Sequence, residues 1–321
     1  MKFLTVSFWG ITSRPACKFS LGLRRLYVPP KGGVNNLGAV SRRLFELSLH
    51  AAHAAIVWTL RYNGLSLTEA RRIRQMAVIN SSSTALKRRI HRGENIVGVS
   101  VGIHSNKEQL SAILDGGPYD FISIDSQHSP YDEDRLVHFS EMAAELGIHL
   151  QFRIKHTQHA YLVGNYLDLG PSGIEVPQVE SLETAIESVS NFYYPPTGVR
   201  SWGGDARLGI EVISERLDYA RWWGETGVLW LQIESINAVT NSRSLALPGV
   251  DCLSFGPADL TFSQEAHPNH SLKTVDDCVR YVVKELEGTD TVVCFRSYNP
   301  ALRQKYYDMG VPVLLETPVG G

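Results

Sequence analysis

The sequence predicts one (β/α)8 barrel over residues 84–321, preceded by a basic extension over residues 1–83. The first observation is that short apolar or β-branched runs alternate with helical segments from Thr84 onward, as repeated βα units require. The second is that eight such runs fit within about 235 residues, close to the length of about 250 residues that is typical of these barrels. The third is a change in charge between the two parts of the chain.

The charge is uneven along the sequence. Residues 1–80 contain 12 Lys and Arg and two acidic residues, a net charge of +10, so residues 81–321 contain 19 basic and 31 acidic residues, a net charge of −12. The total of −2 gives no bulk attraction to nucleic acid or to an anionic membrane, and we expect neither as a partner. With 43% hydrophobic and 20% charged residues, the composition is that of a globular protein.

The basic extension allows two interpretations. Its first 25 residues contain five basic and no acidic residues among Ser, Thr and Leu, which is typical of a mitochondrial transit peptide. Alternatively, residues 1–83 form a disordered extension with no part in the fold.

Four cysteines without a CxxC pair favour reduced thiols inside a cell. We therefore expect a cytoplasmic location, or a mitochondrial one if the extension is a targeting segment.

The predicted strands are apolar runs of the length and composition of buried parallel strands. They are Asn95 to Ile103, Phe121 to Asp125, His149 to Ile154, Gly173 to Pro177, Val228 to Glu234, Cys252 to Gly256, Thr291 to Arg296 and Val311 to Glu316.

Helical patterns lie between these runs, and several of them end at Gly, which favours the left-handed conformation found after helix C-termini. The expected helices include Lys107 to Leu114, Asp132 to Leu146, Ala160 to Leu169, Leu182 to Tyr194, Val275 to Leu286 and Pro300 to Met309. A doubly wound sheet is the alternative to a barrel. No GxGxxG motif follows the first strand and no P-loop motif is present, so we favour the barrel.

Two carboxylates follow neighbouring predicted strands, at the barrel end where active sites of this fold lie. Glu234 ends the fifth strand, and Asp259 comes shortly after the sixth. Since adjacent strands are about 4.8 Å apart, both side chains can reach one ion, and oxygen ligands suit Mg²⁺ or Mn²⁺ better than zinc. Each carboxylate taken alone could equally form a local salt bridge or cap a helix. Gly256, before Asp259, lets the backbone approach a ligand closely.

Six segments carry a resemblance to a known family. They are Ile124-Asp125-Ser126-Gln127-His128, Arg153, Val176 to Glu180, Tyr194 to Arg200, Gln232-Ile233-Glu234 and Gly256 to Leu260. Their combination resembles the HpcH/HpaI aldolases, which are metal-dependent class II pyruvate aldolases and include the fungal macrophomate synthase. The resemblance runs from about Thr84 to Glu316 and implies a TIM barrel of the phosphoenolpyruvate/pyruvate type.

The resemblance implies a role for each matching residue. Glu234 and Asp259 would bind a divalent cation, Mg²⁺ or else Mn²⁺ or Co²⁺. His128 would be the acid/base, paired with Asp125. Arg153 would hold the 2-oxo oxygen of a pyruvate-like substrate, where a guanidinium stabilises the developing enolate charge.

Further residues complete the predicted substrate site. Backbone donors of the turn Gly256-Pro257-Ala258 would receive the substrate carboxylate, Pro257 contributing none, and Gln127 would lie beside the substrate. Arg200 is predicted to contact the acceptor half of the substrate, although packing of its loop against the fourth strand is an equal alternative.

Two features depart from the family pattern. Gln127 stands where the family usually has Glu, which would alter proton transfer or metal affinity. After Glu316 only five residues remain, whereas the family continues into a last helix that is exchanged between subunits of a hexamer. The sequence thus predicts a barrel that lacks this helix, and a homo-oligomer whose assembly differs if nothing replaces it.

These features predict a metal-dependent carbon–carbon lyase that cleaves or forms 4-hydroxy-2-oxo acids through a pyruvate enolate, with a 2-oxo acid and an aldehyde as small-molecule partners. A second interpretation is an oxaloacetate decarboxylase that forms a carbon–carbon bond in secondary metabolism, as macrophomate synthase does. A third is a degenerate barrel without catalysis, suggested by Gln127 and the short C-terminus.

Overall fold

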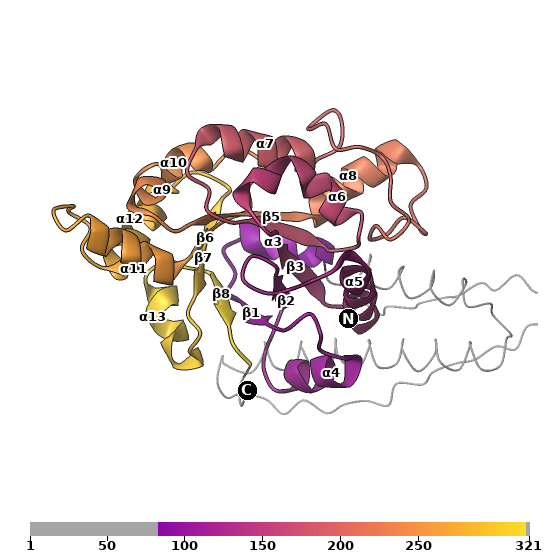
Figure 1. The fold of residues 1–321 in the computed structure, drawn as a ribbon, viewed down its shortest axis with the longest axis horizontal. Coiled ribbons are helices and arrows are strands. Elements are labelled where there is room, and N and C mark those ends of the chain that lie inside the picture. Colours follow the sequence, from indigo (N-terminus) through magenta and orange to yellow (C-terminus); the bar gives the residue numbers. More distant parts are fainter. Residues whose placement is uncertain (1–82, 319–321) are drawn as a thin grey trace, which may run out of the picture. The chain divides into compact units, whose positions relative to one another are not determined.

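The computed structural model describes residues 83–318 (Figure 1), so the predicted extension up to residue 82 lies outside the described residues. Eight parallel strands form a closed barrel in the order β1 to β8, with helices around it, which confirms the predicted fold. The strands are Ile96–Ser100 (β1), Phe121–Asp125 (β2), His149–Arg153 (β3), Gly173–Val176 (β4), Val228–Ile233 (β5), Cys252–Phe255 (β6), Val292–Arg296 (β7) and Val313–Glu316 (β8).

Helices precede the barrel and connect its strands. They are Ser83–His91 (α3), Lys107–Asp115 (α4), Glu133–Leu146 (α5), Val163–Leu167 (α6), Leu182–Phe192 (α7), Arg216–Thr226 (α8), Ile236–Thr240 (α9), Ser242–Leu245 (α10), Pro257–Ala266 (α11), Val275–Glu285 (α12) and Arg303–Asp308 (α13), with 3-10 turns at Thr157–Leu162 (η2) and Pro300–Leu302 (η3).

The sequence did not predict α8 between β4 and β5. Its buried side chains are Tyr219, Trp223 and Thr226, a narrow stripe among charged and exposed residues. A narrow stripe gives little of the 3.6-residue periodicity by which a helix is identified.

Local sequence determines where several helices begin. Asn106 and Gln109 form a capping box at the start of α4, and Thr274 and Asp277 form another at the start of α12. Each box satisfies two backbone N–H groups that have no partner inside the helix. These caps set the point at which the chain leaves the strand end and turns back along the barrel.

The barrel interior is mostly apolar near its N-terminal end, with His149 and Gln151 as buried polar side chains among the apolar ones. Phe121 and Trp230 pack edge to face there, with ring centroids 5.2 Å apart. The Phe121 ring occupies the space beside Gly98, where an added Cβ would lie 2.0 Å from the ring. Other interior residues at this end are Ile96, Val228, Cys252, Cys294, Val313 and Leu315, and Leu86 and Ile90 of α3 pack against the same cluster. Helix α3 therefore closes this end of the barrel.

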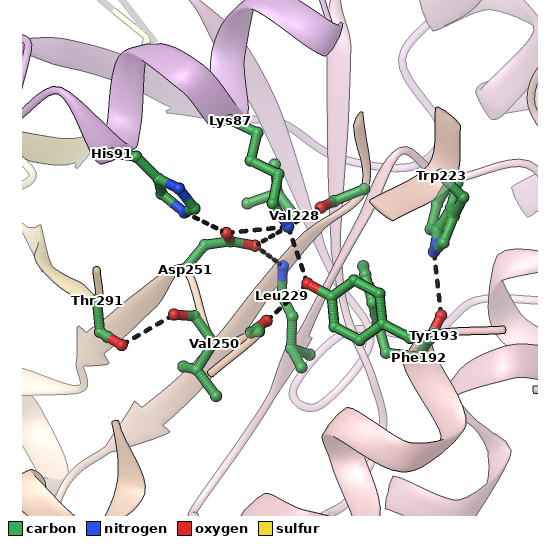
Figure 2. Close-up of polar contacts among 12 residues, drawn as sticks. Lys87, His91, Phe192, Tyr193, Trp223, Val228, Leu229, Val250, Asp251 and Thr291 are labelled. Carbon is green, nitrogen blue, oxygen red and sulfur yellow. Dashed lines mark hydrogen bonds and ion pairs between the residues drawn. The ribbon is translucent and has the colours of Figure 1, made fainter. Parts of the chain in front are cut away.

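A buried ion pair joins α3 to the barrel, as Figure 2 shows. Lys87 Nζ donates to Asp251 Oδ2 at 3.1 Å, to Tyr193 Oη at 2.8 Å and to the Gly227 carbonyl at 2.8 Å. Asp251, just before β6, also accepts from the Leu229 amide at 2.7 Å and lies 2.7 Å from His91 Nε2. Burial would lower the pKa of Lys87, but Asp251 and Tyr193 outweigh burial and raise it. Lys87 is thus held as a cation in the interior.

No helix within residues 83–318 is long and apolar enough to cross a membrane.

The buried Lys87–Asp251 pair predicts that two Asp-to-Ala substitutions lower the free energy of unfolding by unequal amounts. Asp251→Ala leaves a buried ammonium group without its counter-ion and should lower the free energy of unfolding by about 3–5 kcal/mol. Asp276→Ala removes the partner of Lys305 from a largely exposed pair and should cost less than about 1 kcal/mol. Urea unfolding of both variants measures the difference; equal losses would show that the buried pair does not anchor α3.

Candidate functional site

Six consecutive strands, β2 to β7, each place one polar side chain inside the C-terminal half of the barrel. We call this set the polar layer. Its members are Asp125, Arg153, Glu175, Gln232, Ser254 and Arg296. Hydrogen bonds connect members on strands that are not neighbours, such as β3 with β5 and β4 with β7, so these side chains meet inside the barrel. The polar layer lies at the end where barrels of this fold carry their active sites.

Arg153 is held by an ion pair with Asp125. Its Nε and Nη2 donate to Asp125 Oδ1 and Oδ2 at 2.8 and 2.7 Å, and its Nη1 donates to Gln232 Oε1 at 3.1 Å. Burial would raise the pKa of Asp125, but the guanidinium of Arg153 outweighs it and lowers that pKa, with help from the Gln127 amide and His128. Asp125 is therefore a carboxylate, and Arg153 is fixed in orientation by three hydrogen bonds.

A second ion pair lies deeper in the same layer. Arg296 Nη1 and Nη2 donate to the two oxygens of Glu175 at 2.9 and 2.5 Å, and Ser254 Oγ donates to Glu175 Oε1 at 2.6 Å. Burial would raise the pKa of Glu175, but Arg296 lowers it; Arg296 itself has a raised pKa because Glu175 outweighs the effect of burial. Both groups are charged although both are buried.

Glu234 carries a buried carboxylate oxygen that has no hydrogen-bond partner. It follows β5, its residue is 5% exposed, and its Oε1 is buried without a hydrogen bond. Burial, and then repulsion by Asp259, raise the pKa of Glu234 to about 7. Asp259 lies in the first turn of α11 and is exposed. The structure thus brings the two predicted metal ligands within electrostatic reach of each other.

This pair of carboxylates fits a divalent cation. A cation would satisfy the unpaired oxygen of Glu234 and relieve its repulsion from Asp259. With Glu234 ionised, four carboxylates of the site (Asp125, Glu175, Glu234, Asp259) face two guanidinium groups (Arg153, Arg296), which leaves two negative charges. Within residues 83–318 no three His, Cys, Asp or Glu side chains converge as a ready metal site. Water or substrate oxygens would have to supply the other ligands, as Mg²⁺ commonly requires.

Gly256 allows Glu234 to take its position. A Cβ on Gly256 would lie 2.2 Å from Glu234 Oε2, so a side chain at residue 256 would displace that carboxylate. The Gly256 amide donates to the Ile233 carbonyl at 3.2 Å, so the sequence-based expectation of a free donor at Gly256 is not supported. Beyond Pro257, the amides of Ala258 and Asp259 belong to the first turn of α11 and have no partner within the helix. Those two amides can receive an anion.

The loop after β2 carries Gln127 and His128. Ser126 fixes this loop, since its amide and hydroxyl both donate to the Arg153 carbonyl, at 3.1 and 2.7 Å. The Gln127 amide donates to Asp125 Oδ1 at 2.8 Å, while Gln127 Oε1 is buried without a partner. His128 is exposed and acts electrostatically on Asp125. Its predicted role in proton transfer stays a prediction.

Arg200 lies elsewhere, in the layer of helices. Its Nη2 pairs with Asp168 Oδ1 at 2.8 Å, and its guanidinium lies 4.6 Å from the Tyr194 ring centroid and 4.9 Å from that of Trp223. The side chain is 1% exposed. The structure does not bring Arg200 into the group around Arg153 and Glu234, and it favours the alternative of a packing role for that loop.

Glu175, Ser254 and Arg296 are residues of the polar layer that were not predicted from the sequence. The available signal was a charged residue at an inward position of an otherwise apolar strand, in Gly-Ile-Glu-Val and in Val-Val-Cys-Phe-Arg. Pairing them required the three-dimensional fold, because Glu175 and Arg296 are 121 residues apart in sequence.

Comparison with known proteins gives consistent matches. Residues 102–291 match the family model described as HpcH/HpaI aldolase/citrate lyase. A hydroxypyruvate/pyruvate aldolase of Cupriavidus necator is 28% identical over 197 residues, 60% of this chain and 71% of the relative. A 2-keto-3-deoxy-L-rhamnonate aldolase of Salmonella gallinarum is 27% identical over 248 residues, 73% of this chain and 90% of the relative.

Solved structures agree with these matches. An HpcH/HpaI aldolase from Desulfitobacterium hafniense superposes with a TM-score of 0.64 and 25% identity, over 72% of this chain and 89% of that one. Macrophomate synthase superposes with a TM-score of 0.59 over 73% of this chain and 82% of that one; at 19% identity it supports the fold alone.

The raised pKa of Glu234 predicts a pH-dependent stability without metal. Between its ordinary value of 4.5 and about 7, the folded protein retains a proton that the unfolded chain releases. The stability of the wild type relative to Glu234→Gln should therefore fall as pH rises through this window, by up to about 3 kcal/mol, and stay constant above it. Unfolding curves from pH 4 to 8.5 in EDTA measure this difference.

Two controls accompany the pH measurement. Glu265→Gln, an exposed residue of α11, should follow the wild-type curve. Mg²⁺ at pH 8 should raise the melting temperature of the wild type and not that of Glu234→Gln, since ligand binding stabilises the folded state. Parallel curves for the wild type and Glu234→Gln would contradict the raised pKa.

Proposed function

The chain belongs to the HpcH/HpaI aldolase/citrate lyase family, and from this membership we propose that it is a carbon–carbon lyase that joins or cleaves pyruvate and an aldehyde as a 4-hydroxy-2-oxo acid. The relatives named as hydroxypyruvate/pyruvate and 2-keto-3-deoxy-L-rhamnonate aldolases support this reaction class. The observation that supports it best is the position of an orientated guanidinium, Arg153, near a buried carboxylate with an unpaired oxygen, Glu234.

Arg153 is suited to bind the 2-oxo oxygen. Of the five N–H groups of a guanidinium, three are used by Asp125 and Gln232, which leaves one on each terminal nitrogen. Because the orientation is set before substrate arrives, these donors can stabilise negative charge as it develops on that oxygen. Asp125 and Gln232 are thus positioning residues for Arg153.

Glu234 and Asp259 would hold the divalent cation. When bound there, the cation supplies Lewis-acid polarisation of the 2-oxo acid. The amides of Ala258 and Asp259 would receive the substrate carboxylate at the start of α11. Binding the carboxylate and the 2-oxo oxygen at separate points orients the substrate above the polar layer.

His128 would transfer the proton of the 4-hydroxyl group. The imidazole of His128 is exposed to solvent, and histidine is the side chain most often used for general acid–base catalysis. Gln127, beside it, adds a neutral acceptor whose buried oxygen has no protein partner. A homo-oligomer and a cytoplasmic location, which the sequence predicts, stay predictions.

The proposed function predicts metal-dependent exchange of the methyl protons of pyruvate in D₂O, together with cleavage of a 4-hydroxy-2-oxo acid to pyruvate. EDTA and Glu234→Ala should each abolish both activities, because the cation then has no site. Proton NMR and a coupled pyruvate assay provide the measurements, with Glu265→Ala as the surface control. Full activity of Glu234→Ala would refute the metal assignment, and oxaloacetate turnover without aldol cleavage would favour the decarboxylase alternative.

Replacing His128 should separate catalysis from binding at the active site. His128→Asn should lower kcat for cleavage by about 10²–10⁴-fold, the usual range for a lost acid/base group, while Mg²⁺-dependent binding of oxalate stays within threefold of wild type. Steady-state kinetics and calorimetry test this, with His138→Asn on the exposed face of α5 as control. A kcat within threefold of wild type would exclude His128 from proton transfer.

A further inference from the structure

The ion pair between Glu175 and Arg296 spans the barrel interior from β4 to β7. Glu175 is 0% exposed and Arg296 5% exposed. Removing two charges from water costs several kcal/mol for each ion, and well-packed apolar residues often replace such pairs without loss of stability. In the N-terminal half of the barrel the interior is instead filled by apolar rings such as Phe121 and Trp230, beside the uncharged amide of Gln151. Packing alone therefore does not require an ion pair here.

Glu175 is a direct neighbour of Arg153. The two residues are register partners on β3 and β4, and the Ile154 amide donates to the Glu175 carbonyl at 3.0 Å. Asp125 is the register partner of Arg153 on its other side. Arg153 thus lies between two carboxylates on adjacent strands, each close enough to influence it. Its charge lowers the pKa of both.

Only one of these carboxylates bonds Arg153 in the structure. Asp125 receives two of its hydrogen bonds. Glu175 is occupied by other donors, since Arg296 bonds both of its oxygens and Ser254 adds a bond to Oε1. Arg296 Nη1 also donates to Ser254 Oγ at 2.7 Å, which closes the group of three. Glu175 is neutralised before it can compete for Arg153.

We propose that Arg296 is a positioning residue of the active site: by occupying Glu175 it leaves Arg153 paired with Asp125 and Gln232, with two N–H groups facing the substrate. Without Arg296, Glu175 is an unpaired buried carboxylate, and Arg153 is the neighbouring cation that can satisfy it. Arg153 would then turn down into the barrel and away from the substrate. The inference rests on the proposed function for Arg153.

If Arg296 acts in this way, the unpaired Glu175 is what weakens pyruvate binding in an Arg296 variant. Arg296→Met should raise the KM for pyruvate in the Mg²⁺-dependent proton-exchange reaction at least tenfold. Adding Glu175→Gln removes the competing charge, so the double variant should return to within threefold of the wild-type KM. A role in folding alone would change the amount of active protein, and hence the apparent kcat, and leave KM unchanged.

The Arg303–Glu316 pair between α13 and β8 provides a control for the loss of an ion pair. Arg303 forms a similar two-bond pair with the buried Glu316, at 2.6 Å for both bonds, between α13 and β8. Arg303→Met should leave the KM for pyruvate unchanged although it also breaks a two-bond ion pair to a buried glutamate. Circular dichroism melts of all variants report whether each protein is folded. If Arg296→Met does not fold, Arg296→Lys keeps the charge without the two-bond geometry and should raise KM at least threefold.

The ¹⁵Nε–H signal of Arg153, assigned by its loss in Arg153→Met, follows the ion pair without catalysis. It should shift in the Arg296 variant and return in the double variant. An unchanged signal or KM in the Arg296 variant, or a double variant no better than the single one, would overturn the inference. If Arg153→Met itself binds and exchanges pyruvate normally, the proposed function of Arg153 fails, whatever the NMR signal shows about its position.

Discussion

A charged side chain that points into a closed barrel loses most of its contact with bulk water, so it needs partners from the surrounding strands and loops. This constraint determines the C-terminal half of the barrel. Asp125 and Arg153 satisfy each other between β2 and β3, and Glu175 and Arg296 do so across the interior. Once these pairs are made, Glu234 keeps a buried oxygen without a partner. Together with the unpartnered Gln127 Oε1 at the same end of the barrel, this unused hydrogen-bonding capacity favours a ligand there.

The same constraint applies at the N-terminal end of the barrel, but there the charged groups find partners within the protein. Lys87 enters the interior from α3, and its ammonium group finds three acceptors, of which Asp251 carries the opposite charge. Asp251 in turn accepts from the backbone and contacts His91. These charged groups satisfy one another and α3 covers this end of the barrel, so the candidate site lies at the opposite end.

The fold could be predicted from the sequence because parallel strands buried on both faces are continuous apolar runs. All eight strands were predicted within about three residues of their observed ends. The sequence also predicts Glu234, Asp259 and Arg153 as site residues, since polar groups at strand ends are adjacent in sequence to the strands that position them; their roles stay predictions. It could not pair Glu175 with Arg296, because that contact depends on the closure of the barrel.

The placements of Arg200 and of the Gly256 amide have local physical causes that the sequence does not show. Arg200 follows a Pro-Pro-Thr-Gly turn, and the sequence does not show whether such a loop faces the barrel mouth or the helices; Asp168 and two aromatic rings decide for the helices. The amide of Gly256 donates to the Ile233 carbonyl, a strand-like hydrogen bond that continues the β5–β6 pairing by one residue beyond Phe255, so it is not free to bind an anion.

The absence of a side chain at Gly98 has an evolutionary consequence. The Phe121 ring fills the volume that a Cβ on residue 98 would need, so the two positions share one fixed space in the barrel. A lineage can acquire a side chain at position 98 only after, or together with, a smaller residue at position 121. Across related barrels the two positions should therefore vary as a pair, and either change alone should be rare.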